Sequence, residues 1–307
     1  MSLDELAAAL GTAVPGGVER AVAAAELSTY RIGGPLAVLV RVPDAEALRR
    51  VGAVLADAGD DVPVLVVGRG SNLLVADTGF AGVAVALTGA FEAVDVAEDR
   101  VRAGGAVPLP VLARRAAAAG RTGLEFYVGI PGSVGGAVCM NAGGHGRETR
   151  EVLIAATVVG LRGDPVRRLG PDDLGLAYRH SDLGPFDVVT DAEFAVRPDE
   201  VEACAARLDE VVRWRREHQP GGANGGSVFR NPPGDAAGRL IDAAGCKGLR
   251  IGGAVVSEKH ANFFQAEAGA TAADVAALVD AVRDRVARSS GVVLETELRL
   301  VGFAAGG

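Results

Sequence analysis

Short apolar runs and alternating apolar and polar residues predict the strands of this chain. A continuous run such as 62–67 has the length and β-branched content of a strand buried on both faces. The alternation over 292–301 is typical of a strand with one solvated face. Strands are predicted in this way at 36–42, 62–67, 94–96, 101–103, 152–159, 188–196 and 292–301, and strand-like segments follow residue 73 through about Leu87.

Apolar residues at helical spacing predict the helices. Asp44 is a suitable N-cap for a helix that places Leu48 and Leu55 on one face. The best-marked helix opens at Thr271 and ends at Gly291. Further helices are predicted at 2–10, from Pro108 or Pro110 to Ala119, and after Asp199, where Val201, Cys204, Leu208 and Val211 share a face. Strands and helices mix without an internal repeat, which indicates an α+β protein.

Glycine is concentrated in two places, and the first is the stretch 128–137 with its continuation 141–146. Glycine loses more backbone entropy on folding than any other residue, so this density needs a local reason. Consecutive backbone N–H groups in such a loop form a concavity that binds phosphate oxygens. An ordinary turn is the alternative, and we favour the ligand cradle.

The second cluster, 68–72, follows the strand at 62–67. It resembles the start of a dinucleotide fingerprint, but Leu73 stands where the third glycine belongs and no helical pattern follows. We therefore expect a phosphate loop between two strands. Two separate cradles suit a ligand with a pyrophosphate, such as a dinucleotide, better than a single phosphate.

Composition excludes several classes. The length of 307 residues allows two or three domains, and the net charge of −8 argues against general nucleic-acid binding. No apolar run is long enough to span a bilayer, and the first residues lack the order of a signal peptide. Three widely spaced cysteines offer no disulfide framework, so the cytoplasm is the expected location. Four histidines without ligand spacing predict no metal site.

A few polar residues lie in contexts that suit chemistry, and each also has a plainer interpretation. Ser227 follows two glycines; it is either a turn residue or a hydroxyl that can protonate a strongly basic enolate carbon. Glu297 is either a solvated strand residue or a carboxylate in a cleft. Arg179 could clamp a substrate carboxylate or lie on the surface. Lys259 and His260 are equally open.

These residues belong to an ordered set of motifs. They are T-x-R-I-G-G at 29–34, G-x-G-S-N-L at 68–73, G-I-P-G-S-V-G-G-A at 129–137, N-A-G at 141–143, Y-R at 178–179, G-S-x-F-x-N-P at 226–232, S-E-K-H-A-N-F at 257–263, and Glu297. In this order they resemble the UDP-N-acetylenolpyruvoylglucosamine reductase (UDP-N-acetylmuramate dehydrogenase, MurB) family over about residues 26–303. About six residues separate His180 from Asp187, which resembles the family's shorter-loop subclass.

The resemblance implies an α+β chain with a two-subdomain FAD-binding fold of the vanillyl-alcohol-oxidase (PCMH) type, at 1–89 and 90–197, and a C-terminal α+β substrate-binding domain at 198–307. It implies noncovalent FAD and NADPH as the reductant. The implied reaction reduces UDP-N-acetylglucosamine enolpyruvate to UDP-N-acetylmuramate in peptidoglycan synthesis. The implied enzyme is a cytoplasmic monomer that binds neither nucleic acid nor membrane.

The resemblance also implies roles for single residues. Hydride passes from NADPH to the flavin, and then from flavin N5 to the vinyl carbon of the substrate. Arg179 and Glu297 would steady the enolate-like intermediate, and Ser227 would protonate the neighbouring carbon. The residues implied to bind the substrate are Tyr178, Arg230, Asn231, Lys259 and His260. Those implied to bind FAD are Gly68, Arg69, Gly70, Ser71, Asn72, Leu73, Gly129, Ile130, Pro131, Gly132, Ser133, Gly135, Gly136, Ala137, Asn141, Ala142 and Gly143.

The sequence departs from the family pattern at a few positions and leaves two alternatives. Arg230 stands where the family commonly has lysine, and Gln265-Ala266 replace a usual Val-Asn pair. One alternative is another FAD-dependent oxidase of the same fold. The other is a nonenzymatic nucleotide-binding regulator, which would have no need of Arg179, Ser227 and Glu297 together.

Overall fold

The structure is a computed structural model that describes residues 1–303. The chain folds into two compact units, each assembled from separate stretches of sequence. Unit 1 comprises Met1–Ala21, Ala37–Arg69 and Gly82–Trp214. Unit 2 comprises Val22–Leu36, Gly70–Ala81 and the chain from Arg215 onward.

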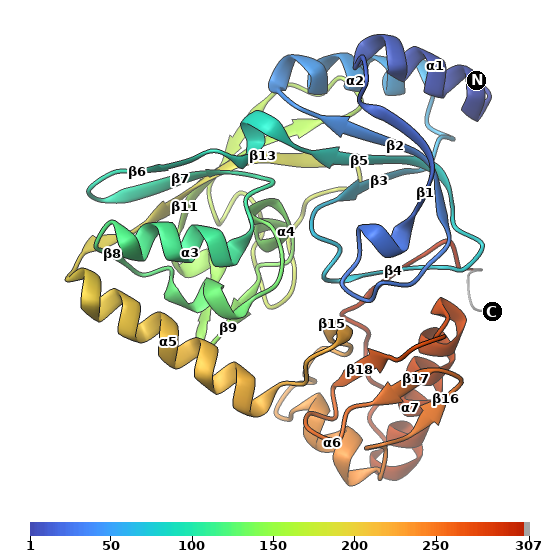
Figure 1. Cartoon of the computed structure of the whole chain (residues 1–307), viewed down its shortest axis with the longest axis vertical. Coiled ribbons are helices and arrows are strands. Elements are labelled where there is room, and N and C mark those ends of the chain that lie inside the picture. The colour runs from blue at the N-terminus through green and yellow to red at the C-terminus, as the bar shows by residue number, and fades with distance from the viewer. Residues whose placement is uncertain (304–307) are drawn as a thin grey trace. The chain divides into compact units, whose positions relative to one another are not determined.

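The first layer of unit 1 packs two helices against a four-stranded sheet (Figure 1). The sheet has the order β1-β2-β5-β3, with β3 and β5 parallel. Its strands are β1 (Val18–Ala23), β2 (Pro35–Val42), β3 (Val64–Val67) and β5 (Phe80–Leu87). α1 (Leu3–Ala13) opens with a capping box from Ser2 to Glu5, and α2 (Ala45–Ala58) opens at the predicted N-cap Asp44. The apolar faces of both helices are buried against the strands.

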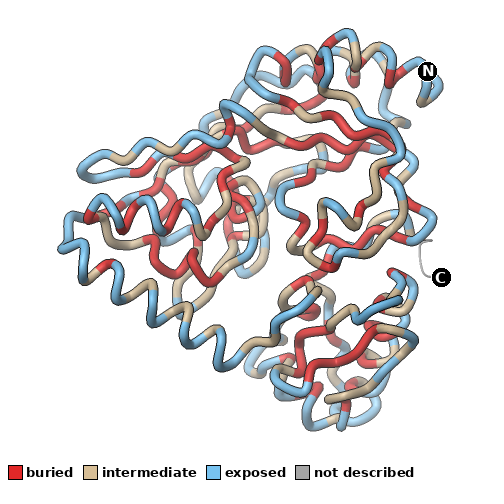
Figure 2. Tube along the Cα trace, in the orientation of Figure 1, coloured by how far each residue is buried: buried red, intermediate tan, exposed pale blue. Residues whose placement is uncertain are grey.

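The second layer of unit 1 is an antiparallel sheet of five strands in the order β12-β11-β13-β7-β6. The strands are β6 (Val94–Val96), β7 (Arg100–Gly104), β11 (Leu153–Gly160), β12 (Arg167–Leu169) and β13 (Asp187–Ala195). α3 (Leu109–Ala118), α4 (Val134–Cys139) and the 3-10 helix η3 (Glu125–Gly129) share its buried core. Figure 2 shows the central strands as buried. Ion pairs join neighbouring strands, such as Arg102 with Asp191 at 2.9 Å.

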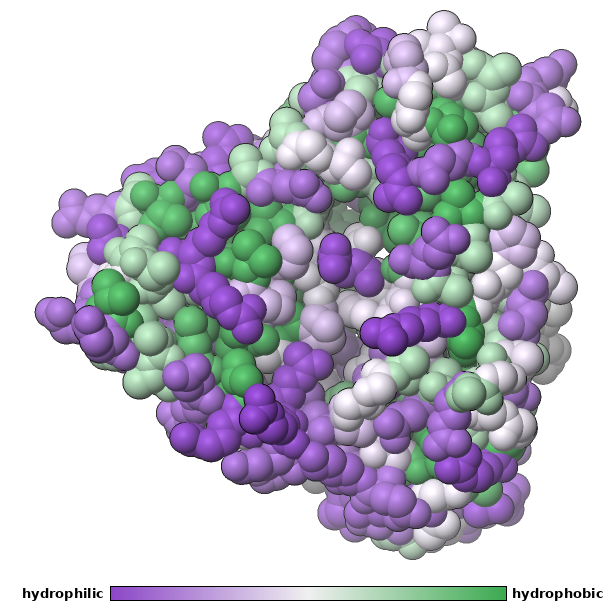
Figure 3. Space-filling model, in the orientation of Figure 1, coloured by the Kyte–Doolittle hydropathy of each residue, from purple (hydrophilic) through white to green (hydrophobic). Residues whose placement is uncertain are grey.

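Helix α5 (Val201–His218) is a long helix with only Cys204 buried. Of its predicted apolar face, Leu208 and Val211 pack partly buried on the core of unit 1, whereas Val201 is 44% exposed. Most of the helix is therefore exposed in Figure 2, and the surface along it is largely hydrophilic in Figure 3.

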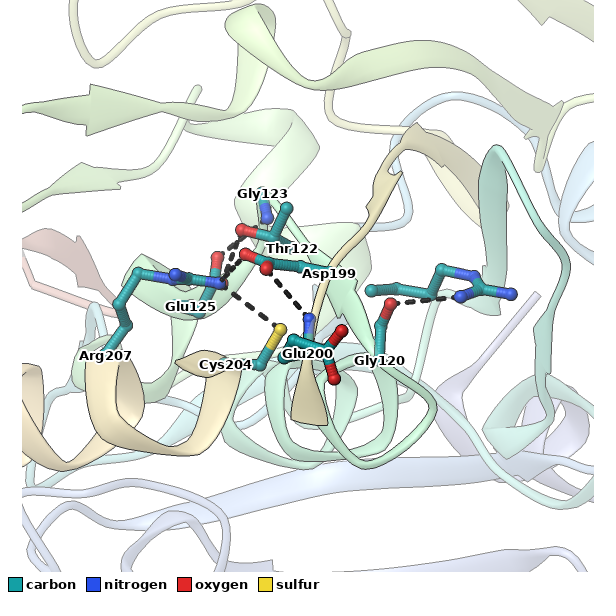
Figure 4. A network of polar contacts seen from close by, with 9 residues as sticks. Gly120, Thr122, Gly123, Glu125, Asp199, Glu200, Cys204 and Arg207 are labelled. Atoms are coloured by element: carbon teal, nitrogen blue, oxygen red, sulfur yellow. Dashed lines mark hydrogen bonds and ion pairs between the residues drawn. The ribbon is translucent and has the colours of Figure 1, made fainter. Parts of the chain in front are cut away.

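One polar network fastens α5 to the second layer (Figure 4). Arg207 donates to Glu125 at 2.9 Å and to Asp199 at 2.6 Å. Burial would raise the pKa of Glu125, but hydrogen bonds from Thr122, the Gly123 N–H and Arg207 outweigh it and hold that pKa below its ordinary value. The carboxylate is therefore ionised in the fold and balanced by Arg207.

Unit 2 contains a four-stranded antiparallel sheet in the order β15-β18-β17-β16. Its strands and helices are β15 (Ala223–Ser227), α6 (Ala237–Ala243), β16 (Arg250–Ile251), β17 (Ala254–Val256), β18 (Phe263–Ala266) and α7 (Ala272–Ser290). α7 begins after Thr271 as predicted, with a capping box of Thr271 and Asp274, and ends at Gly291, whose φ is +75°. The apolar face of α7 forms the centre of the core.

The two N-terminal segments of unit 2 complete this core. β4 (Leu73–Val75) pairs in parallel with β19 (Arg299–Val301). Tyr30 is fully buried in the core, and burial raises the pKa of its phenol. Asp77 accepts hydrogen bonds from the backbone N–H groups of Ala272 and Ala273, so it stabilises the start of α7.

The remaining elements are short. They are η1 (Ala24–Glu26), η2 (Gly89–Glu92), η4 (Thr149–Glu151), the pair β8 (Arg121–Thr122) and β14 (Arg197–Pro198), and the pair β9 (Gly143–Gly144) and β10 (Arg147–Glu148). Within residues 1–303 no helix combines the length and the apolar character needed to cross a bilayer.

The predicted α+β class is confirmed, but one strand prediction is wrong. Only Arg299–Val301 of the predicted strand 292–301 is strand, and Thr296 makes an isolated bridge to Phe229. The segments β1, β15 to β18 and α6 were not among the predicted elements. The three-domain division at 89 and 197 stays a prediction; the structure groups 22–36 and 70–81 with the C-terminal residues and α5 up to Trp214 with unit 1.

Candidate active site and cofactor cradle

The glycine-rich stretch 129–137 forms a turn followed by the short helix α4. Ser133 is the N-cap of α4, and its hydroxyl accepts a hydrogen bond from the Gly136 N–H at 3.3 Å. The N–H groups of Val134 and Gly135 donate to the carbonyls of Val107 and Gly105, each at 2.9 Å. The chain's own acceptors therefore take up three N–H groups of the loop, including that of the exposed Gly136.

The loop 68–73 continues from β3 and passes from unit 1 to unit 2 between Arg69 and Gly70. A Cβ atom on Gly68 would lie 2.5 Å from the Ser133 hydroxyl, so the two glycine clusters touch within unit 1. Gly70 has a φ of +59°, and a Cβ there would lie 2.0 Å from the Leu27 carbonyl oxygen in unit 2. Close backbone approach therefore requires glycine at position 70, whereas at Gly68 the neighbouring atom belongs to the Ser133 side chain.

Arg179 occupies a two-residue turn in unit 1. Ala177 and His180 exchange backbone hydrogen bonds, which leaves Tyr178 and Arg179 as the central residues. Arg179 has a φ of +55°, a region that favours glycine or asparagine. Its guanidinium lies 5.0 Å from the centre of the Tyr178 ring and donates to the Gly143 carbonyl at 3.1 Å. An arginine is thus held in a costly backbone conformation beside the segment 141–143.

Ser227 is the last residue of β15 in unit 2, where Gly225 and Gly226 interrupt the pairing with β18. The Gly226 N–H donates to the Asn224 side chain at 3.0 Å, and Gly226 has a φ of +74°. A Cβ on Gly225 would lie 2.5 Å from the Tyr30 ring. The irregularity leaves Ser227 half-buried, immediately before the buried Val228.

Glu297 lies beside Ser227 through backbone contacts of unit 2. Its N–H donates to the Val228 carbonyl at 2.8 Å, and its carbonyl accepts from the side chain of Asn72 at 2.9 Å. Asn72, implied to bind the cofactor, therefore also holds the backbone of Glu297. In unit 2 the Glu297 backbone thus bonds to the residue that follows Ser227, while Arg179 belongs to unit 1.

Of the residues implied to bind the substrate, Tyr178 lies in the unit 1 turn described above, and the other four have different environments within unit 2. Arg230 carries a buried Nε that lacks a hydrogen-bond acceptor among the described residues. Asn231 accepts from the Ala237 N–H at 3.0 Å, at the start of α6. Lys259 is exposed and donates to the Arg216 carbonyl. The ring of His260 packs on Phe263 at 4.8 Å, and burial lowers its pKa.

A groove of about 380 Å³ in unit 1 is separate from these residues. It lies beside α5, and none of the residues implied to bind or catalyse lines it. Its lining is Gly123, Glu125, Phe126, His145, Arg147, Arg207, Glu210, Val211 and Trp214. Within residues 1–303 there is no group of three or more His, Cys, Asp or Glu residues placed to hold a metal ion.

Comparison with known proteins connects this geometry to a family. Residues 36–167 match the model of an FAD binding domain, and residues 218–301 match that of the UDP-N-acetylenolpyruvoylglucosamine reductase C-terminal domain. The reductase of Acidiphilium cryptum is 50% identical over 89% of this chain and 88% of its own length. That of Methylorubrum extorquens strain PA1 is 46% identical over 92% and 90%. The chain belongs to the UDP-N-acetylenolpyruvoylglucosamine reductase family.

Solved structures agree with this family assignment. The reductase (MurB) from Thermus caldophilus matches with a TM-score of 0.80 and 38% identity, over 92% of this chain and 98% of that chain. A variant of berberine bridge enzyme matches with a TM-score of 0.50 and 9% identity, over 64% of this chain and 44% of that one. The second likeness concerns the fold alone, and with the FAD-binding match it confirms the predicted FAD-binding fold of the PCMH type.

FAD is the cofactor of this reductase family member, and the matched FAD-binding region includes both glycine clusters. The residues present fit the cofactor. The loops 68–73 and 129–137 contain no acidic residue, and Gly68 and Gly136 are exposed glycines that allow the backbone close approach to a pyrophosphate.

Asn141, which was predicted to bind the cofactor, and Ser181, for which no role was predicted, organise the Arg179 turn. The side chain of Asn141 donates to the Ala177 carbonyl, and the hydroxyl of Ser181 donates to the Cys139 carbonyl. Because these contacts join residues about 40 positions apart, no local pattern in the sequence could reveal them.

Proposed function

We propose that this chain reduces UDP-N-acetylglucosamine enolpyruvate to UDP-N-acetylmuramate with NADPH as the reductant, and that Arg179, Ser227 and Glu297 carry the substrate chemistry. Membership of the reductase family is the observation that carries the reaction, since relatives at 46–50% identity share about nine-tenths of the chain. The residue roles rest on the chemistry of each side chain and on its local environment.

When bound, FAD supplies the two-electron chemistry, by accepting hydride from NADPH and donating it to the vinyl carbon of the substrate. Backbone groups of the loops 68–73 and 129–137 hold it. The protein's task is then to bind the enolpyruvyl group, to orient it, and to deliver one proton. The net change adds two hydrogens across the double bond and consumes one NADPH and one proton.

Arg179 binds the carboxylate of the enolpyruvyl group in this proposal. A guanidinium matches a carboxylate with two parallel hydrogen bonds, and it stabilises negative charge that spreads onto the carboxylate as the enolate-like state develops. The positive φ of Arg179 supports a functional role, because strained backbone conformations of this kind cluster at ligand-binding and active sites.

Ser227 donates the proton to the carbon next to the carboxylate, and Glu297 in its protonated form donates a hydrogen bond that steadies the enolate-like intermediate. A hydroxyl is a weak acid, but an enolate carbon is basic enough to take its proton. The irregularity at Gly225 and Gly226 supports this assignment, because it presents the half-buried Ser227 immediately before the buried Val228.

Arg230 binds the diphosphate of the substrate in this proposal. Its buried Nε lacks an acceptor among the described residues, and a phosphate oxygen supplies one. We place the reaction in the cytoplasm, where NADPH and nucleotide-activated sugars are available, and we expect a monomer. The net charge of −8 supports a protein without nucleic-acid partners.

An anaerobic flavin assay on the purified protein tests this function. NADPH should bleach the visible flavin absorbance, and the enolpyruvyl sugar nucleotide should restore it. A protein that binds no FAD would contradict the proposal and favour the regulator. A flavin that is bleached but reoxidised only by oxygen would favour the oxidase.

Ser227→Ala separates the proton-donor role from cofactor binding. Bleaching by NADPH should stay as in the parent, whereas recovery with the substrate should slow by about 100-fold or more, the contribution typical of a positioned proton donor. Ser289→Ala, which removes a hydroxyl that donates to the Val286 carbonyl within the end of α7, is the control. Unchanged recovery in Ser227→Ala would contradict the role of Ser227.

A further inference from the structure

Asn141 is a fully buried polar residue in the cradle segment 141–143 of unit 1. It has a φ of +40°, a conformation that asparagine tolerates better than most residues. Its Oδ1 accepts the Arg150 N–H at 2.9 Å, and its Nδ2 donates to the Ala177 carbonyl at 3.0 Å. Both polar groups of the side chain are thus used inside the protein.

Ala177 is the first residue of the turn that presents Arg179. Its carbonyl also accepts the His180 N–H that closes the turn, so the bond from Asn141 acts on the base of the Arg179 turn. Arg179 in turn donates to the Gly143 carbonyl, two residues after Asn141. The turn and the segment 141–143 are therefore joined at both ends.

Two further side chains strengthen this joint. The Ser181 hydroxyl donates to the Cys139 carbonyl at 2.7 Å, just beyond the turn. The Arg150 guanidinium donates to the Leu176 carbonyl at 3.0 Å, just before it. Four hydrogen bonds thus join the turn and its flanking residues to the region 139–150, and together they fix the position of the turn.

The segment 141–143 is itself firmly held from its other side. The Ala142 carbonyl accepts both the N–H and the hydroxyl of the buried Thr149, at 3.0 and 2.9 Å. Thr149 accepts the phenol of the buried Tyr127 at 2.9 Å. This chain of buried hydrogen bonds makes the segment a rigid support for whatever it holds.

We propose that Asn141 is a positioning residue for the substrate arginine: it fastens the Tyr178–Arg179 turn to the segment that follows the cofactor cradle, so that cofactor and substrate carboxylate are held in one register. This inference rests on the proposed role of Arg179. In this proposal the Asn141 side chain does not bind FAD directly, because both of its polar groups bond within the protein. The cofactor roles of Ala142 and Gly143 stay predictions. A small displacement of a binding group can slow a reaction about 100-fold.

Asn141→Gly tests the proposal in the FAD-loaded enzyme. Glycine keeps the positive φ accessible and removes both side-chain hydrogen bonds. FAD content and bleaching by NADPH should stay within about twofold of the parent, while the limiting rate of recovery with the substrate should fall about 10- to 100-fold. The affinity of the oxidised enzyme for the substrate, measured from the shift of the flavin spectrum on titration, should weaken as well.

A double-mutant cycle with Arg179→Met separates the outcomes. If Asn141 acts through Arg179, Asn141→Gly should slow recovery little further once Arg179 is methionine. Equal slowing in both backgrounds, or loss of FAD from Asn141→Gly, would overturn the inference. If Arg179→Met alone recovers like the parent, the role of Arg179 fails, and the inference fails with it.

Two other comparisons keep the test decisive if Asn141→Gly does not fold. Ser181→Ala removes the neighbouring bond and should slow the same half-reaction by a smaller factor. A Cβ on Gly143 would lie 3.3 Å from the Arg179 guanidinium and 2.7 Å from the Arg147 carbonyl, whereas a Cβ on Gly144 meets only ordinary contacts at 3.6 Å. Gly143→Ala should therefore slow recovery more than its control Gly144→Ala; equal rates in all these variants would overturn the inference.

Discussion

Replacing Arg179 by glycine and by alanine should reveal the backbone strain that this residue carries. Both variants remove the guanidinium, and with it the hydrogen bond to the Gly143 carbonyl. They differ only in how well they tolerate a φ of +55°. The comparison therefore isolates the backbone conformation from the loss of side-chain contacts.

The expected difference follows from two opposing effects. A left-handed backbone costs a non-glycine residue roughly 1–2 kcal/mol. The glycine variant avoids this cost in the folded state. Its unfolded chain, however, has more conformations to lose on folding, which reduces the stability difference by roughly 0.4–1 kcal/mol. Arg179→Gly should thus be about 1 kcal/mol more stable to unfolding than Arg179→Ala.

Urea unfolding in excess FAD measures this difference. Trp214 is the only tryptophan of the chain, and its ring lies 4.8 Å from that of His145 in unit 1, so its fluorescence reports unfolding of the unit that contains Arg179. Both variants should also lose recovery of the flavin with the substrate. Equal stability of the glycine and alanine variants would refute the strained turn, and recovery at the parent rate would refute the role of the guanidinium.

Two further predictions concern the supports of the units. Arg207→Met should destabilise unit 1 by about 1–2 kcal/mol relative to its control Arg213→Met, because it leaves the buried carboxylate of Glu125 without its cation. Because that carboxylate has a lowered pKa in the fold, the difference should be full at neutral pH and shrink as the pH falls below the ordinary value of 4.5, as urea unfolding at several pH values would show. Gly225→Ala should cost about 1–3 kcal/mol, because its Cβ would lie 2.5 Å from the Tyr30 ring, whereas Gly221→Ala meets nothing within 4 Å and should be neutral in thermal unfolding.

Helices whose start and buried face are set by residues within the helix itself could be predicted from the sequence. The N-cap Asp44 and the capping box at Thr271 mark helices whose apolar faces are buried as expected. Residues 292–298 of the predicted strand 292–301 show what a local pattern cannot specify. Its apolar and polar residues alternate, but a strand also needs a partner edge, and β19 finds one in β4 only from Arg299 onward.

The candidate site shows the same division. The density of glycine indicated both cradles, and the family motifs indicated Arg179, Ser227 and Glu297. The sequence could not show that the N–H groups of Val134 and Gly135 are used by carbonyls about 30 residues earlier. Nor could it show that residues 22–36 and 70–81 join the C-terminal unit, since both facts depend on contacts between distant segments.

A single-turnover experiment tests the proposed reaction most directly. The enzyme is reduced anaerobically with one equivalent of NADPH, mixed with one equivalent of UDP-N-acetylglucosamine enolpyruvate, and the sugar nucleotide is analysed by mass spectrometry. The account predicts a product with two more hydrogens than the substrate, formed at the rate at which the flavin absorbance returns. An unchanged substrate beside a flavin that stays reduced until oxygen is admitted would contradict it.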